Sequence, residues 1–193
     1  MENALVPSEL SFLCKVLSPW TKEDVQLRET AGRVDWQVVA VLANRSNLAP
    51  ALRVALKARS LWAYAPAELR ALLDELYRFN AGRNELLEQE LLEVAELLTR
   101  ASITPMPLKG AAALATGLFS DSAVRFMWDL DVFVPEGTIR RAVRALEQGG
   151  WFVPQKYASS VRNLEAFYGT KHFAPLICAG CSAPVELHRR ASS

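Results

Sequence analysis

The spacing of hydrophobic and polar positions divides the chain into two parts. Through residues 1–100 apolar side chains recur every three or four positions, for example over residues 35–42 and 51–56, which is the period of one helix face. The clearest run covers residues 66–100, where a stripe of leucines faces away from a row of glutamates. Asn80-Ala81-Gly82 is a candidate interruption of this run, because glycine costs about 1 kcal/mol relative to alanine inside a helix. We therefore predict a helical region over residues 1–100 that packs on the core of the protein.

After residue 100 the pattern changes to short alternating segments. Proline and glycine pairs punctuate them: Pro135-Glu136 resembles a helix start and Gly149-Gly150 a helix stop. Alternation of strands and helices is typical of helices that pack on a mixed sheet. We predict an α/β (α+β) fold in which residues 101–193 form this layer. The expected strands are 103–108, 127–134, 151–153, 172–178 and 184–188, and the expected helices are 110–118 and 136–148.

Composition and charge exclude several classes of protein. A chain of 193 residues that is 51% hydrophobic can bury a sizeable core. With 22 Lys and Arg against 21 Asp and Glu, the net charge is +1, so no overall field attracts nucleic acid or an anionic membrane. Residues 1–4 lack a basic signal-like start, and no segment has the ~20 apolar residues of a membrane span. Three cysteines do not make a disulfide framework. We expect a cytoplasmic protein with reduced thiols.

Two aspartates stand two residues apart in an apolar setting, Trp128-Asp129-Leu130-Asp131-Val132. In a strand Asp129 and Asp131 would project to one face while their apolar neighbours anchor the other face. Two buried like charges need a cation or hydrogen-bond donors, and Mg²⁺ prefers oxygen ligands. A later acid, Glu186, would complete such a site from a neighbouring strand. The competing interpretation is a strand end with two solvated acids, but the apolar flanks favour the metal site.

Three motifs, in order along the chain, carry a resemblance to a known family. They are Leu108-Lys109-Gly110-Ala111, the segment Arg125-Phe126-Met127-Trp128-Asp129-Leu130-Asp131, and Val185-Glu186-Leu187-His188. With these motifs the chain resembles the uncharacterised nucleotidyltransferase family of the polymerase-beta-like superfamily. Residues 77–84 and 172–176 also resemble the family's corresponding segments. The resemblance implies a nucleotidyltransferase-like core over residues 101–193.

The implied activity is transfer of a nucleoside monophosphate from a nucleoside triphosphate, such as ATP, to a hydroxyl acceptor. Two divalent ions, Mg²⁺ or Mn²⁺, would stabilise the attacking and leaving oxygens of an in-line displacement. The resemblance assigns catalysis and metal binding to Asp129, Asp131 and Glu186, and nucleotide binding to Lys109, Gly110, Arg125 and His188. Taken singly, the second group also has structural interpretations: a helix start at Gly110, a solvated lysine, an arginine paired with an acid, and an ordinary hydrogen-bonded histidine.

The chain departs from the family pattern in two places. The better-known superfamily signature has a glycine pair shortly before the acidic strand, whereas here a single glycine follows Lys109 well before Asp129. More chain commonly follows the family's histidine, whereas only residues 189–193 follow His188. This predicts either a short member, completed as a homodimer, or a truncated one. The alternative function is a catalytically inactive binding or regulatory module that keeps the fold.

The acceptor and a second metal chemistry stay open at this point. A small molecule, a protein side chain or an RNA end would fit the same metal core, although the near-neutral charge argues against a long nucleic-acid footprint. Separately, Cys178-Ala179-Gly180-Cys181 has the spacing of a zinc knuckle, and His172 and His188 would complete four ligands. The competing interpretation, a pair of reduced thiols in a loop, is the one we favour.

Overall fold

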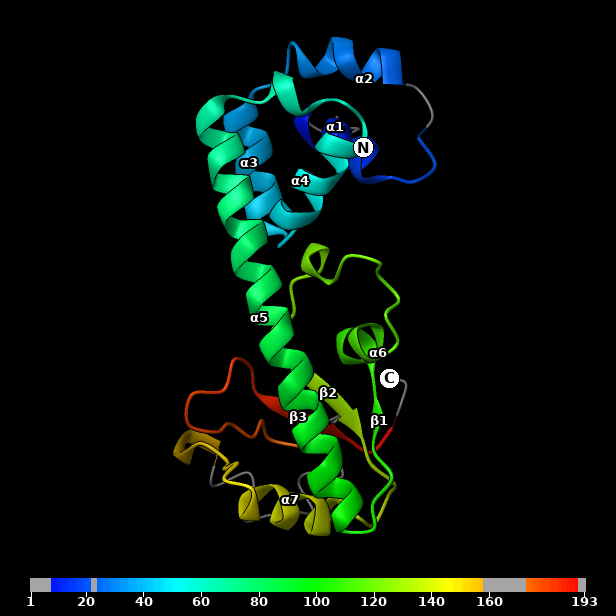
Figure 1. The fold of residues 1–193 in the computed structure, drawn as a ribbon, viewed down its shortest axis with the longest axis vertical. Coiled ribbons are helices and arrows are strands. Elements are labelled where there is room, and N and C mark those ends of the chain that lie inside the picture. Colours follow the sequence, from blue (N-terminus) through cyan, green and yellow to red (C-terminus); the bar gives the residue numbers. More distant parts are fainter. Residues whose placement is uncertain (1–7, 22–23, 158–172, 191–193) are drawn as a thin grey trace, which may run out of the picture. The chain divides into compact units, whose positions relative to one another are not determined.

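The chain divides into two compact units. The computed structural model describes residues 8–21, 24–157 and 173–190. One unit comprises residues 1–82 with 123–126, and the other comprises residues 83–122 with 127–193. The long helix α5 (Ala67–Arg100) contributes residues to both (Figure 1). The compact units thus divide the chain inside α5, at Gly82, whereas the sequence suggested a division near residue 100.

The first unit consists of helices, as the apolar spacing predicted. Asp35 caps the start of α3, because its side chain accepts hydrogen bonds from the amides of Gln37 and Val38 at 2.8 and 3.3 Å. Pro50 stands in the first turn of α4, where its missing N–H has no cost. Besides the start of α5, the helices are α1 (Ser8–Leu17), α2 (Asp24–Ala31), α3 (Trp36–Arg45), α4 (Ala49–Ala58) and the 3₁₀ helix η1 (Trp62–Tyr64).

Helix α5 runs without a break from Ala67 to Arg100, so the interruption expected at residues 80–82 is wrong. The buried side chain of Asn80 explains the difference. Its amide donates to the carbonyl oxygens of Ala123 and Arg125 at 2.6 and 3.0 Å. These bonds stabilise the helical conformation at this position. Gly82 has no atom within 4 Å of where a Cβ would stand, so no close contact requires glycine there.

The second unit contains a three-stranded mixed sheet in the order β1-β2-β3. Strand β1 (Met106–Pro107) pairs antiparallel with β2 (Leu130–Phe133), and β2 pairs parallel with β3 (Val185–His188). The unit also contains helices α6 (Lys109–Ala115) and α7 (Ile139–Gln148) and the 3₁₀ helix η3 (Gln155–Tyr157). A further 3₁₀ turn, η2 (Ser122–Val124), precedes β2. The predicted fold class, helices with a mixed sheet, is confirmed.

Several strands are shorter than the apolar runs suggested. The run 103–108 contributes only Met106 and Pro107 to the sheet, since Pro105 and Pro107 have no N–H to donate to a ladder. The runs at 151–153 and 172–178 form only the isolated bridges Phe152 to Ile177 and Leu176 to Val185. His172 lies outside the described residues. The acidic strand covers 130–133 rather than 127–134, and α7 begins at Ile139 rather than at residue 136.

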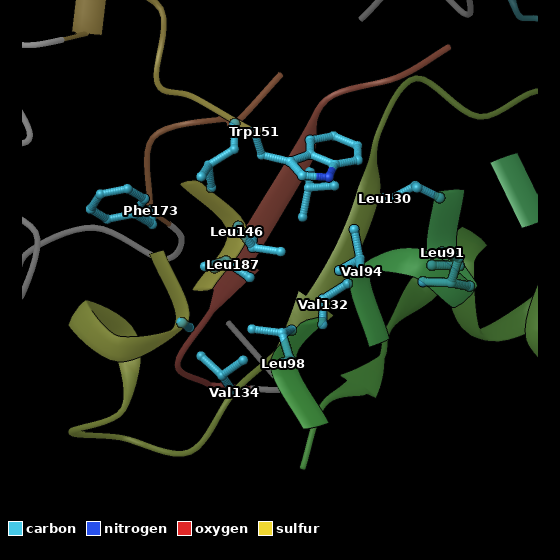
Figure 2. Packing of buried hydrophobic residues seen from close by; sticks show 14 of the residues in the cluster. Leu91, Val94, Leu98, Leu130, Val132, Val134, Leu146, Trp151, Phe173 and Leu187 are labelled. Atoms are coloured by element: carbon cyan, nitrogen blue, oxygen red, sulfur yellow. The ribbon is translucent and has the colours of Figure 1, made fainter. Parts of the chain in front are cut away.

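The core of the second unit lies against one face of β2 and β3. Figure 2 shows Leu91, Val94 and Leu98 of α5 on one side of these strands, with Leu146 of α7 and Trp151 nearby. The strands contribute Leu130, Val132, Val185 and Leu187, which are all 1% exposed or less. Hydrophobic burial therefore fixes one face of the strand pair and leaves the opposite face for polar side chains.

Two glycines provide a matched test of this packing. A Cβ at Gly149 would clash with Cδ1 of Leu97, whereas a Cβ at Gly82 would meet nothing within 4 Å. We expect Gly149→Ala to lower the free energy of unfolding by about 1–2 kcal/mol through overpacking, and Gly82→Ala to raise it by up to about 1 kcal/mol. Urea unfolding followed by circular dichroism measures both. Equal stability of Gly149→Ala and wild type would mean that Leu97 moves aside at no cost.

Candidate functional site

The parallel pairing of β2 with β3 brings two acids side by side. Asp131 pairs with Glu186 in the register, and Phe133 pairs with His188. Side chains at paired and alternate positions share one face of a sheet, so Asp131, Glu186 and His188 project from the face opposite the apolar core. The sequence had predicted a third carboxylate from a neighbouring strand, and the structure places Glu186 directly beside Asp131.

Asp131 is the buried centre of this polar face. It is 2% exposed, and its Oδ1 atom lies 2.8 Å from Nζ of Lys109 and 2.6 Å from Nε2 of His188. A buried carboxylate without donors is costly, so these two contacts explain how the charge is tolerated. Both of these contacts end on the same carboxylate oxygen, Oδ1.

Lys109 enters the site at the junction of β1 and α6. Its φ of 47° lies in the left-handed region, which costs a residue with a side chain roughly 1–2 kcal/mol. The neighbouring amide of Leu108 donates to the carbonyl oxygen of Asp131 at 2.9 Å. The hydrogen bond to Asp131 raises the pKa of the Lys109 ammonium above its usual value; partial burial opposes this, and the charges of Asp131, Asp129 and Glu186 add to it. Lys109 is therefore a cation set among three carboxylates.

Asp131, Glu186 and His188 form a group that fits a metal ion. One ligand atom from each residue lies within 4.8 Å of the other two, and ligands on opposite sides of Mg²⁺ are about 4.2 Å apart. Neighbouring ligands of Mg²⁺ lie only about 3 Å apart, so the side chains would have to move closer together to share one ion. Carboxylate oxygens suit Mg²⁺ and Mn²⁺, and an imidazole nitrogen suits transition metals. The donor set is thus compatible with the divalent ions that the sequence suggested.

The other predicted site residues lie in different surroundings. Asp129 is half-buried just before β2 and lies outside this three-residue group, although its charge acts on Lys109. Gly110 is buried in the first turn of α6. Arg125 belongs to the first unit, where its carbonyl oxygen accepts from Asn80. The binding roles of these three residues stay predictions.

The comparison with known families fits the arrangement of acids. A family model described as "Uncharacterised nucleotidyltransferase" matches residues 32–193. The chain belongs to this nucleotidyltransferase family. The resemblance inferred from its three motifs is thereby confirmed. No curated protein matches the chain, and no solved structure matches it.

Helix α5 holds both site strands of this nucleotidyltransferase, a role that sequence reasoning missed. Arg83 donates to the carbonyl oxygen of Met127, just before β2, and to that of Ser182, just before β3. Glu90 accepts from the amide of Ser182 at 2.6 Å. The available signal was a polar residue at position 83, four residues before buried Leu87 on the same helix face.

His188 also has a partner that the sequence did not identify. The resemblance assigned its imidazole to nucleotide binding, and in the structure its Nε2 atom lies 2.6 Å from Oδ1 of Asp131. The alternation of Val185-Glu186-Leu187-His188 places the ring on the same face as Glu186. Only the register with β2 reveals that this face also contains Asp131.

The cysteine pair does not join a metal-binding group in the part of the chain that the structure describes. The Cys178 amide donates to Sγ of Cys181 at 2.9 Å, and this thiol contacts the Cys178 carbonyl oxygen at 3.0 Å. In the described ranges, the group that includes His188 contains Asp131 and Glu186 rather than the two cysteines. His172 lies outside those ranges. The geometry is that of two reduced thiols in a turn, which is the interpretation favoured from the sequence.

Burial, reinforced by the hydrogen bond with Cys181, raises the pKa of the Cys178 thiol to about 12. The reactive thiolate is therefore scarce at neutral pH. We expect iodoacetamide at pH 8 to label exposed Cys14 well before Cys178. Labelling of Cys178 should accelerate about tenfold per pH unit up to its pKa. Peptide mapping by mass spectrometry measures both rates, and equal labelling of the two cysteines at pH 8 would contradict the raised pKa of Cys178.

None of the helices in the described ranges combines the length and the apolar character needed to cross a membrane.

Proposed function

We propose that the protein transfers a nucleoside monophosphate from a nucleoside triphosphate to a hydroxyl acceptor by a two-metal mechanism. The observation that carries the proposal is the register of β2 and β3, which sets Asp131 beside Glu186 with His188 next to them. Two adjacent carboxylates, one of them buried, are stabilised by positive charge. Membership of a nucleotidyltransferase family indicates which chemistry that charge serves.

Asp129 and Asp131 would hold both divalent ions, and Glu186 would join them as the third carboxylate at the catalytic ion. When bound, Mg²⁺ or Mn²⁺ would stabilise negative charge at the α-phosphate and on the attacking oxygen. Glu186 is also the residue best placed to accept a proton from the acceptor hydroxyl, because its carboxylate is half-buried rather than enclosed. His188 acts through Asp131: its hydrogen bond fixes the orientation of that carboxylate, in the manner of outer-shell partners of metal ligands.

The triphosphate would meet the first turn of α6. Lys109 carries a compact charge on a long flexible stem, and 61% of its side chain is exposed, so its ammonium can turn toward a phosphate. Gly110 would allow the phosphate to approach the backbone closely. For Arg125 the family resemblance implies the role of a second cation that neutralises the nucleotide.

For the acceptor we propose a small molecule or a protein side chain. The net charge of +1 provides no extended field for a polynucleotide. A homodimer would supply covering surface around the site.

Asp131→Asn and Glu186→Gln should each reduce nucleotide transfer by at least about 100-fold, because losing a ligand costs more than losing an outer-shell partner. Radiolabelled nucleoside triphosphates with Mg²⁺ or Mn²⁺ measure transfer, both to the protein itself and to small hydroxyl compounds. Circular dichroism verifies that both variants fold.

Asp74→Asn is the matched control. Asp74 also bonds to cationic side chains, with Oδ1 2.5 Å from Arg53 and 3.1 Å from Lys57, but it belongs to the first unit. Its variant should retain wild-type transfer. If Asp131→Asn and Asp74→Asn both transfer nucleotide at the wild-type rate, the catalytic assignment is wrong. Transfer that persists in EDTA would reject the metal requirement.

A further inference from the structure

Lys109 presents a positive charge at the place where the proposed function requires a metal ion. Its Nζ atom lies 2.8 Å from Oδ1 of Asp131, and Asp129 and Glu186 act on the same ammonium. Asp131 thus bonds to this lysine directly, while the charges of the other two acids assigned to metal binding only add to the rise in the pKa of its ammonium. A divalent ion bound between them would have to share the Asp131 carboxylate with this ammonium or replace it.

The backbone and the side chain of Lys109 differ in how firmly they are held. The backbone is fixed beside β2, because the preceding amide of Leu108 bonds to the Asp131 carbonyl oxygen and Lys109 itself is left-handed. Strained backbone of this kind persists only where the surroundings determine it. The side chain, by contrast, is 61% exposed. Water readily replaces the hydrogen bonds and ion pairs of a side chain that is so exposed. The ammonium can therefore leave Asp131 without any movement of the main chain.

We propose that Lys109 is an internal counter-ion, which neutralises the acidic site of the metal-free protein and is displaced from Asp131 when a divalent cation binds. The inference rests on the proposed function, since it requires the same acids to bind a cation. The released ammonium then turns to the triphosphate that accompanies the metal. One lysine would thus stabilise the empty site and, afterwards, the nucleotide.

If this exchange occurs, removing the charge of Lys109 lowers the stability of the metal-free protein and raises its affinity for the cation. Without the ammonium, the carboxylates repel one another and the metal-free protein is less stable. The same repulsion is relieved by the incoming cation, and no lysine competes with it. A variant without the charge should therefore melt at a lower temperature when metal-free and bind the cation more tightly. A lysine that only supports the site would weaken cation binding when removed.

The test compares Lys109→Met, Lys109→Gly and Lys109→Arg with wild type. Glycine adopts the left-handed conformation freely, so Lys109→Gly removes the charge and relieves backbone strain, which keeps a folded variant in the series. Lys57→Met is the matched control, because Lys57 pairs with Asp74 in the first unit. Mn²⁺ binding is measured by calorimetry and by the Mn²⁺ spin-resonance signal, without nucleotide. Thermal melting in EDTA measures the metal-free stability.

We expect Lys109→Met and Lys109→Gly to bind Mn²⁺ about five- to tenfold more tightly than wild type, as removal of a half-exposed competing charge implies. Lys109→Met should melt at a lower temperature in EDTA. Lys109→Arg and Lys57→Met should bind Mn²⁺ as wild type does. The difference between Lys109→Met and wild type should shrink as salt is raised.

Three results would overturn the inference. Equal Mn²⁺ affinity in wild type and both uncharged variants would reject the counter-ion while leaving the metal site and the proposed function intact. Weaker binding in both uncharged variants would make Lys109 a support of the site rather than a competitor. Failure of every protein, including wild type, to bind Mn²⁺ would remove the metal site and with it both proposals.

Discussion

The parallel pairing of β2 with β3 is the constraint on which the site depends. Because side chains alternate along each strand, one register decides both faces at once. Leu130, Val132, Val185 and Leu187 enter the core on one side, and Asp131, Glu186 and His188 gather on the other. A slip by one residue would bury the acids in the core and expose the apolar row. The hydrophobic effect therefore enforces an arrangement of like charges that electrostatics alone would oppose.

Helix α5 converts this pairing into a fixed position for the site. Its apolar residues seal the core face of the strands (Figure 2). Its polar residues Arg83 and Glu90 bind the main chain immediately before each site strand. The two strands are therefore held by backbone contacts at the ends where they enter the sheet. Preorganisation of this kind places carboxylates without relying on flexible loops.

The acidic site was predictable from the sequence as far as local periodicity determines it. The alternation around Asp131 and around Glu186 indicates which side chains of each strand share a face, whereas Asp129 lies just before β2 and its place on that face stays a prediction. The three motifs, in their order along the chain, identified the family. Pairing with a distant segment is not a local property, so the contacts of Asp131 with Lys109 and His188 could not be derived. They require both the register of β2 with β3 and the left-handed backbone at Lys109.

The fold shows the same division between local and tertiary causes. The long helix follows from its apolar stripe, and its boundaries near residues 66 and 100 were predictable. Its continuity through Asn80 was not, because the carbonyl oxygens that bind this side chain lie more than forty positions away in sequence. The predicted strand at 103–108 is mostly not formed, for a local reason that the sequence already contained. Two prolines in it have no N–H to donate to the ladder.

Residues 123–126 belong to the first unit although the chain on both sides of them belongs to the second. The second unit is therefore discontinuous in sequence, and its core draws Leu87, Leu91, Val94 and Leu98 from α5. A fragment that begins after Arg100 would carry the acids but would lack one wall of its interior. The unit that contains the acids is consequently not one continuous segment of the chain. Recombination after Arg100 would separate the acids from the α5 side chains that pack against their strands.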